Sequence, residues 1–333
     1  MPTAALKRAR RIGAAVLVVA VGLGLWAFAL EPASLTTQQH KLLIPNWSPE
    51  LSGLRVAVLA DLHVGSPFNG ISKLHRIVEL TNRLTPDLIV IPGDLVIQGV
   101  LGGSFVTPED TAAVLAGLRA PQGVWASLGN HDWWFDARRT IAALERQKIA
   151  VLEDTAVRIQ RGNAHFWLVG ISDFWEGPHD VRKAMGHVRD EAPVLVFTHN
   201  PDVFPSVSDR FSLLIAGHTH GGQVRVPLLG RPIVPSKYGQ RFAFGHVVEG
   251  RPRLKSTSQE ILHVHPSSHR GLVAVPDLVA QVRSHRSRVV EGMPDTLVDV
   301  ELDLLVVPIA SAFDDVTERE ALAVLRGHDR TAE

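Results

Sequence analysis

The feature that most constrains the fold is a series of short apolar runs, rich in Val, Ile and Leu, between residues 54 and 216. The runs are Leu54–Ala60, Leu88–Ile91, Val124–Leu128, Trp167–Ile171, Val194–Thr198 and Leu213–Ala216. Within each run the apolar residues are nearly continuous, which is typical of strands covered on both faces. The runs therefore predict buried strands rather than strands with one face in water.

Helix-like segments separate several of these runs. Ser72–Leu84 has apolar residues at helical spacing. Thr107 followed by Pro108 provides a favoured N-cap residue and a favoured first helical residue. Asp136–Arg146 and His179–Arg189 are two further expected helices. This alternation of strands and helices predicts the α/β fold class.

Composition narrows the possible functions. Of the 333 residues, 45% are hydrophobic and 20% are charged, which is typical of a globular protein. Lys and Arg total 34, and Asp and Glu also total 34, so the chain lacks the basic excess of a nucleic-acid-binding protein, and no nucleic acid partner is expected. The chain has no cysteine but 16 histidines, so any transition metal would be bound through imidazole and carboxylate groups.

The N-terminal 30 residues have the pattern of a membrane segment. Residues 1–11 carry four basic residues and no acid, and residues 12–30 carry no charge. A helix over residues 12–30 is roughly 28 Å long, which matches the hydrocarbon layer of a bilayer. We expect residues 1–30 to form a cytoplasmic basic segment and a single transmembrane signal-anchor helix, with the remainder outside the cytoplasm.

Cleavage of this segment is the alternative. Ala27-Phe28-Ala29 fits the pattern of a signal-peptide cleavage site, which would give a secreted protein. Arg10-Arg11 also permits a twin-arginine signal. Each of these interpretations places the chain from residue 31 onward outside the cytoplasm.

Changes in composition divide the rest of the chain. Residues 31–50 contain several prolines and are expected to form a linker, and residues 51–250 are expected to form one domain. Residues 251–333 are a C-terminal extension of uncertain fold. Thr317 to Glu320 has the pattern of a helix capping box, but no chemical motif occurs in the extension.

Residues able to bind a metal follow five of the six apolar runs. These motifs are Asp61-Leu62-His63, Gly93-Asp94, Gly129-Asn130-His131-Asp132, His199-Asn200 and Gly217-His218-Thr219-His220. Only Trp167–Ile171 lacks such a motif, because Ser172-Asp173 follows it. Ligands of α/β sheets bind at the carboxyl ends of the strands, so we expect the five motifs to meet there.

The spacing within the motifs suggests how the side chains converge. In extended backbone, residues i and i+2 point to the same side, so Asp61 and His63 could share a metal, and His218 and His220 could serve adjacent metals. Gly93, Gly129 and Gly217 precede these residues, and glycine permits unusual backbone conformations at a strand end. Gly-Asp, Asp-x-His or His-x-His alone is weak evidence, whereas Gly-Asn-His-Asp and Gly-His-Thr-His-Gly-Gly-Gln are more specific. The complete ordered set indicates a metal site.

In its order of motifs the chain resembles the calcineurin-like metallophosphoesterase superfamily. Asp61-Leu62-His63-Val64-Gly65 and Gly217-His218-Thr219-His220-Gly221-Gly222-Gln223 match the family pattern closely. The resemblance covers about residues 52–250. Together with the N-terminal apolar segment, it is strongest to the bacterial membrane-associated branch. It implies a four-layer α/β/β/α sandwich with a dinuclear metal centre at one edge.

The resemblance also assigns roles to individual residues. One metal ion would be held by Asp61, His63, Asp94 and His220, and the other by Asp94, Asn130, His199 and His218, so that Asp94 bridges both. The chemistry of these ligands suits two divalent ions of Mn, Fe or Zn. His131 would not bind metal but would face the scissile phosphate and act as the catalytic residue.

The expected function is hydrolysis of a phosphomonoester or phosphodiester by a metal-activated water. Membrane proximity makes a lipid-linked or cell-envelope phosphate ester the expected kind of substrate. The alternative is a non-catalytic scaffold that retains the fold for partner binding. The sequence departs from the family after Gly250, where a glycine- and serine-rich strand is expected but Arg251 to Thr257 follows. A diverged extension and a change of reading frame are both open explanations.

Overall fold

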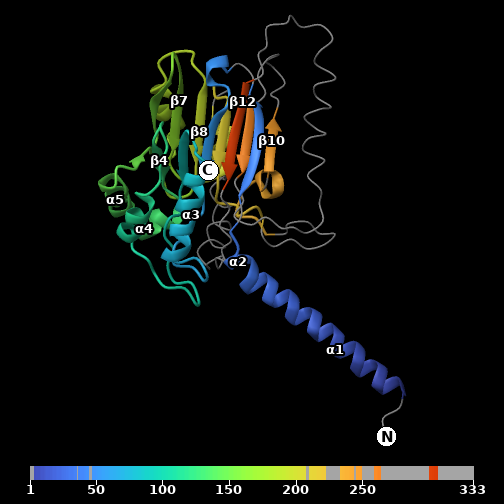
Figure 1. Cartoon of the computed structure of the whole chain (residues 1–333). Helices are drawn as coiled ribbons and strands as arrows, with labels where there is room; N and C mark the ends of the chain where they lie inside the picture. The colour runs from blue at the N-terminus through green and yellow to red at the C-terminus, as the bar shows by residue number, and fades with distance from the viewer. Residues whose placement is uncertain are drawn as a thin grey trace, which may run out of the picture.

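The computed structural model describes residues 4–35, 37–44, 47–207, 210–222, 233–243, 245–249, 259–263 and 300–306. Its centre consists of two six-stranded sheets with the orders β1-β12-β2-β3-β4-β5 and β10-β11-β9-β8-β7-β6 (Figure 1). Neighbouring strands from β12 to β5 are parallel, as are β11, β9, β8 and β7. The α/β class expected from the sequence is confirmed.

All six apolar runs form strands at the expected places. These are β2 (Leu54–Val58), β3 (Leu88–Pro92), β4 (Val124–Ser127), β7 (Ala164–Ile171), β8 (Val194–Thr198) and β9 (Leu213–Ala216). The other strands are β1 (Gln38–Ile44), β5 (Ala150–Val151), β6 (Thr155–Arg161), β10 (Gly245–Glu249), β11 (Gln259–His263) and β12 (Val300–Val306). None of the apolar runs in the sequence predicted these six strands.

The expected helices also form. They are α3 (Ile71–Arg83), α4 (Pro108–Leu115), α5 (Asn130–Arg146) and α6 (Val181–Gly186). Thr107 caps α4 as predicted, because its hydroxyl accepts a hydrogen bond from the backbone N–H of Asp110. Helix α5 begins earlier than expected and is interrupted at Asp136, whose backbone is not helical. The Asp136 carboxylate accepts from the Arg139 N–H and so caps the second half of the helix.

Apolar side chains form three layers of packing around the sheets. Residues such as Val58, Val90, Phe197 and Ile215 fill the space between the two sheets. Helices α3, α4 and α5 cover the outer face of the first sheet. Helix α6 and the 3₁₀-helices Pro201–Ser206 and Gly239–Phe242 cover the second. All residues of β3, β8 and β9, and nearly all of β2, are therefore buried, as the continuous apolar runs indicated.

The N-terminal segment extends away from this body. Helix α1 (Ala4–Leu25) is followed by a π-helical turn (Trp26–Leu30) and by α2 (Glu31–Ala33), and no residue of α1 is buried. The uncharged stretch of residues 12–30 is thus divided between two kinds of helix. Across the described residues, no helix combines the length and the apolar character needed to cross a membrane.

Segments from both ends of the chain add strands to the sheets. Residues 31–50, expected as a linker, contain β1, and residues 251–333 contain β11 and β12. Gln38, at the start of β1, pairs with Val306, which in turn pairs with Val58 at the end of β2. The N-terminal segment therefore joins the domain at the edge where β2 ends. The capping box at Thr317 to Glu320 lies outside the described residues.

A partly buried carboxyl group that follows β5 affects stability. Glu153 follows β5, and its Oε1 accepts a 2.7 Å hydrogen bond from the backbone N–H of Leu128. Burial of the side chain, with Asp154, Asp173 and Asp132 adding like charge, raises the pKa of Glu153 to about 8. Ionisation of Glu153 therefore opposes folding, and this cost grows as the pH rises from the unfolded pKa toward the folded pKa.

We predict that Glu153→Gln becomes more stable relative to the parent chain as the pH rises. Glutamine keeps an acceptor for the Leu128 N–H but carries no proton to lose. The difference in free energy of unfolding should increase by about 1–3 kcal/mol between about pH 5 and about pH 8. Urea denaturation at several pH values measures it. Glu145→Gln in α5, where the side chain is exposed, is the matched control and should show no such trend. A pH-independent difference for Glu153→Gln would contradict the prediction.

Candidate metal centre

The predicted ligands meet at one edge of the two sheets. Asp61 and His63 follow β2, Asp94 follows β3, His199 follows β8, and His218 and His220 follow β9. Asn130 begins α5, directly after β4. Nitrogen and oxygen atoms of six of these ligands, all except Asn130, and of His131 form three overlapping groups, each with all ligand atoms within 4.8 Å of one another. The groups are Asp61–His63–His220, His63–Asp94–His131 and Asp94–His199–His218.

Asp94 belongs to two of these groups and lies close to a histidine of the third. Its Oδ2 is 3.4 Å from His63 Nε2 and 3.1 Å from His199 Nε2. Its Oδ1 accepts a 3.0 Å hydrogen bond from the backbone N–H of His131, in the first turn of α5. The positive end of the α5 dipole thus faces this carboxylate. A single buried carboxylate connects ligands from both sheets.

Each outer group is closed by a contact between the sheets. On one side His220 Nε2 is 3.8 Å from Asp61 Oδ1, which also accepts a hydrogen bond from the His218 N–H. On the other side His199 Nε2 lies 3.1 Å from both Asn130 Oδ1 and His218 Nδ1. The remaining His199 nitrogen, Nδ1, is 2.8 Å from the carbonyl oxygen of Pro92, which orients the ring.

The side chains do not converge in the way that the spacing suggested. Five of the seven predicted ligands have left-handed backbone rather than extended backbone: Asp61, His63, Asp94, His218 and His220 have φ between 38° and 71°. The i and i+2 argument for Asp-x-His and His-x-His was therefore wrong, although the residues do meet. Such conformations are unfavourable for non-glycine residues and occur preferentially at functional sites.

The three glycines of the motifs serve different purposes. Gly93 has φ of 82° and supplies the unusual backbone that we expected. Gly129 and Gly217 have no positive φ, so that expectation was wrong for them. A Cβ at Gly129 would collide with the Asp94 carboxylate, and a Cβ at Gly217 would lie 2.6 Å from Asp61 Oδ2. Both glycines are needed because a ligand carboxylate lies against the backbone.

Electrostatic interactions in the site favour an ionised Asp94. Burial opposes its ionisation, but His199, His131 and His63 outweigh burial and hold the pKa of Asp94 well below its usual range. Burial would likewise lower the pKa of His199, but Asp94, Asp61 and Asp173 raise it to about 10. In the metal-free site a proton on His199 thus compensates the Asp94 charge, and a cation that binds there must displace it.

The other ligands respond mainly to burial. Burial lowers the pKa of His63 and of His218 well below the usual value, so both imidazoles are neutral and suited to bind a metal. Burial also raises the pKa of Asp61, although His220 and His199 oppose this effect. Buried carboxylates and neutral imidazoles held this close together are the donor set that a divalent transition metal requires. The described residues therefore fit a metal centre.

His131 lies next to the predicted ligands. Its ring is 4.8 Å from the His63 ring and 4.8 Å from the Trp134 ring, and 9% of the residue is exposed. Asp132, the next residue, accepts hydrogen bonds from the backbone N–H groups of Gly129, Leu95 and Val96. Through these hydrogen bonds the Asp132 side chain connects the loop after β3 to the loop after β4.

One aromatic residue at the site was not predicted. The Trp175 ring meets the His218 ring edge to face at 4.3 Å between centroids. Asp173 positions it, because Asp173 Oδ2 accepts from the N–H groups of Trp175 and Glu176 at 2.8 Å. The sequence only weakly indicated that Trp175 lies at the site, because Ser172-Asp173 after β7 is not a metal-ligand motif.

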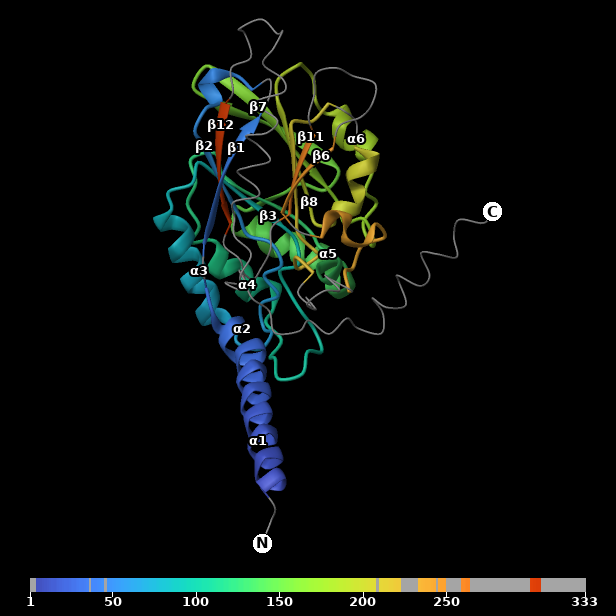
Figure 2. The same ribbon diagram turned by 90° about the vertical axis from the view of Figure 1, so that its right-hand side faces the viewer.

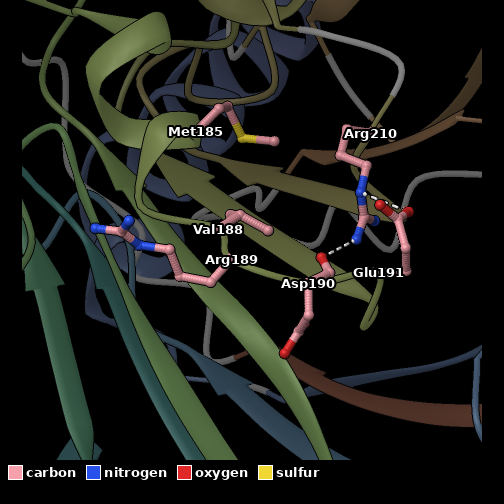
Figure 3. Close-up of a pocket in the computed structure, with 6 residues that line it drawn as sticks. All are labelled: Met185, Val188, Arg189, Asp190, Glu191 and Arg210. Atoms are coloured by element: carbon pink, nitrogen blue, oxygen red, sulfur yellow. Dashed lines mark hydrogen bonds and ion pairs between the residues drawn. The ribbon is translucent and has the colours of Figure 1, made fainter.

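A separate depression lies at the opposite edge of the second sheet. It has a volume of 270 Å³ and is lined by Met185, Val188, Arg189, Asp190, Glu191 and Arg210 (Figure 3). Arg210 there donates to the carbonyl oxygens of Asp190 and Ala192 and pairs with Glu191. These residues precede β8 and β9, whereas the predicted ligands follow them, so the depression is not part of the metal centre.

Comparison with known proteins agrees with this geometry. A family model described as Calcineurin-like phosphoesterase matches residues 54–222. The chain belongs to this family. Calcineurin-like phosphoesterases use divalent metal ions to hydrolyse phosphoric esters, and the matched residues include every predicted ligand and His131.

Several curated members of the family are similar to the chain. Phosphodiesterase YaeI of Escherichia coli is 33% identical over 229 residues, which cover 67% of this chain and 80% of that one. UDP-2,3-diacylglucosamine pyrophosphatase LpxG of Chlamydia trachomatis is 25% identical over 64% of this chain and 77% of that one. The transmembrane protein with metallophosphoesterase domain of Danio rerio is 33% identical over 52% of this chain and 42% of that one.

We predict that Gly129→Ala weakens metal binding. The added Cβ must displace the Asp94 carboxylate, so affinity for Mn²⁺ should fall by about 10- to 100-fold, as when groups that orient a ligand are removed. Calorimetric titration of the metal-free protein measures the affinity. Gly186→Ala in α6 is the matched control, because its Cβ would meet nothing within 4 Å. Equal affinities for the two variants would show that the close approach is unimportant.

Proposed function

We propose that the chain is a dinuclear metal-dependent phosphoesterase that hydrolyses a phosphomonoester or phosphodiester. One observation carries the proposal: Asp94 Oδ2 lies within 3.4 Å of an imidazole nitrogen from each of the two outer ligand groups. The first group, Asp61, His63 and His220, would hold one cation together with Asp94. The second, Asn130, His199 and His218, would hold the other.

When bound, two divalent cations of Mn, Fe or Zn would supply positive charge to the phosphate and lower the pKa of a water nucleophile. The residues of the chain do the rest. Asp94 and Asp61 balance part of the positive charge, and the His199 ring is oriented by the Pro92 carbonyl. The close packing of Gly129 and Gly217 against the two carboxylates fixes their positions. Because these groups are preorganised, little reorganisation is needed during the reaction.

His131 would act on the substrate from beside the metals. Its backbone N–H is held by Asp94 and its ring contacts Trp134, so the imidazole has a defined position at the edge of the site. From there it could stabilise negative charge on the phosphoryl oxygens or protonate the leaving oxygen. A ring nitrogen of His131 lies within 4.8 Å of the ligand atoms of His63 and Asp94, so His131 could itself bind a metal. A test must therefore separate catalysis from metal binding.

We further propose that residues 12–30 attach the chain to a cell membrane, with the catalytic domain outside the cytoplasm. The large apolar side chains of α1, such as Val18 and Leu23, are exposed, which would be unfavourable in water. The Danio rerio relative is named as a transmembrane protein, and LpxG is named as a pyrophosphatase of UDP-2,3-diacylglucosamine. The LpxG name supports a substrate that is lipid-linked or part of the cell envelope, and membership of the bacterial membrane-associated branch.

The catalytic unit of this proposal is residues 51–250 together with strands from the flanking segments. All the proposed ligands lie within 51–250. Strands β1, β11 and β12 add to the sheets from outside those bounds. The N-terminal segment of residues 1–30 would then be the membrane attachment, and the strand β1 within residues 31–50 would join it to the domain.

A substrate panel tests the proposed activity. The full chain in detergent, loaded with Mn²⁺, Fe²⁺ or Zn²⁺, should hydrolyse at least one class among phosphomonoesters, phosphodiesters, nucleotides and lipid phosphates. Phosphate release and chromatography of the products measure turnover. Asp94→Asn is the control, since it removes the charge that the two ligand groups share. Retained metal without turnover on any class would instead favour a non-catalytic scaffold for partner binding.

We predict that His131→Ala keeps its metal but loses most of its activity. Removal of a group that transfers a proton or stabilises the transition state should lower kcat by about 10²- to 10⁴-fold. Metal analysis of the same preparation separates the two roles, because loss of a ligand would lower metal content. Trp133→Phe, a change in the apolar packing of α5, is the control. Unchanged turnover for His131→Ala would contradict the catalytic role, and loss of metal would make His131 a ligand.

A further inference from the structure

Two loops that carry exposed apolar residues project from the metal centre. The first, Ser66–Asn69, begins three residues after the ligand His63. The second, residues 98–107, joins β3 to α4 and follows the ligand Asp94. The Ser104 N–H donates to the Gly65 carbonyl at 2.8 Å, so the loops are hydrogen-bonded to each other at their base. We call Ser66–Asn69 and residues 98–107 the paired loops.

Within the residues that the structure describes, the exposed large apolar side chains are concentrated in few places. Phe68 is 54% exposed, Leu101 is 94% exposed and Phe105 is 47% exposed. Among the described residues, the other large apolar side chains with comparable exposure belong to the N-terminal segment up to Leu30, with the single exception of Ile233. The paired loops and the N-terminal segment thus carry nearly all of the large apolar side chains that are exposed in the described part of the chain.

The backbone conformation of Phe68 is unfavourable for an aromatic residue, so the energetics of folding do not explain why this side chain is exposed. Ser66 to Asn69 is a tight turn, closed by the Asn69 N–H and the Ser66 carbonyl at 2.9 Å, with Pro67 at its second position. Phe68, at the third position, has φ of 62°, where such turns strongly favour glycine or asparagine. An aromatic side chain is thus held in solvent on unfavourable backbone, which indicates a function outside the fold itself.

The N-terminal segment leaves the domain beside these loops. Lys73 Nζ, in the first turn of α3, donates to the Pro32 carbonyl at 2.6 Å, and Leu35 packs against the apolar layer that contains α3. Helix α3 begins at Ile71, two residues after the first loop ends. In both views the loop between β3 and α4 extends beyond α3 and α4 on the side from which α1 emerges (Figures 1 and 2).

From this juxtaposition we infer that the paired loops insert Phe68 and Leu101 into the same lipid bilayer that the N-terminal segment contacts. The metal centre then faces the bilayer surface, and its substrate is a phosphate ester whose lipid part remains in the membrane. The occupant of the loop surface is a bilayer because the loops and α1 both expose large apolar side chains and lie on the same side of the domain. Apolar and aromatic side chains of this kind bury well at the boundary between headgroups and acyl chains. This inference rests on the proposed membrane attachment and gives the proposed phosphoesterase its substrate class.

Site-specific fluorescence tests the insertion directly. The chain has no cysteine, so Leu101→Cys and Phe68→Cys each give a single labelling site. The full chain, labelled with a nitrobenzoxadiazole dye, is reconstituted into vesicles of phosphatidylethanolamine and phosphatidylglycerol. Asn163→Cys is the matched control, because Asn163 is exposed in the turn before β7, at the opposite edge from the metal centre.

Dyes at positions 68 and 101 should shift to shorter wavelength and be quenched by lipids that carry a nitroxide near the headgroup. The dye at position 163 should remain accessible to aqueous iodide. The inference is overturned if the dyes at positions 68 and 101 are as accessible to iodide as the dye at 163. It is also overturned if the chain does not float with the vesicles.

Activity provides a second readout. Two p-nitrophenyl phosphodiesters are compared that differ only in a methyl or a hexadecyl group, the latter dissolved in the vesicles. Leu101→Asp should lower turnover of the hexadecyl ester by about tenfold, the scale set by the burial of a leucine side chain, and leave the methyl ester within about twofold. Leu101→Phe should retain both activities.

The two readouts separate the inference from the proposed function. Equal loss on both esters in Leu101→Asp would mean that the loop merely supports the metal centre, and would overturn the inference. Absence of turnover by the parent chain on both esters and on every class of the substrate panel would contradict the proposed phosphoesterase. The fluorescence result would still decide whether the paired loops enter the bilayer.

Discussion

The rest of the structure depends on a buried negative charge, the carboxylate of Asp94. It lies between the two sheets at the ends of their strands, and three histidines and the N-terminus of α5 surround it. A charge in this position is unfavourable unless cations compensate it. The left-handed backbone at five ligands and the glycines packed against two carboxylates all serve to bring donor atoms to this point. Much of the local irregularity at the sheet edge therefore has one electrostatic cause.

Sequence reasoning succeeded where the relevant information was local. Continuous apolar runs predicted the six central strands, and the Thr107 N-cap predicted the start of α4, because each signal depends only on neighbouring residues. The ligand set followed from the order of the motifs. The way in which Asp61 and His63 converge could not be predicted, because left-handed backbone at a non-glycine residue leaves no trace in the sequence. Strands β1 and β12 were missed because their pairing joins segments that most of the chain separates.

The edge that contains the metal centre also contains the attachment of the N-terminal segment. Parallel strands place all their carboxyl ends together, so every loop that follows a ligand emerges on the same side. Because β1 runs antiparallel to β12, the chain also enters its sheet from that side. The topology of the sheets alone thus brings the catalytic chemistry and the N-terminal segment to one surface.

The position of β12 has a consequence for the order in which the protein assembles. Strand β12 lies between β1 and β2, although it is made long after both. During synthesis β2, β3 and β4 can pair as they emerge from the ribosome, but β1 has no neighbour in the described sheet until residue 306 has been made. Until then, the Lys73–Pro32 hydrogen bond and the packing of Leu35 are the contacts available to join the N-terminal segment to the domain. Completion of the first sheet is therefore a late event, and β1 takes its place in the sheet only at that stage.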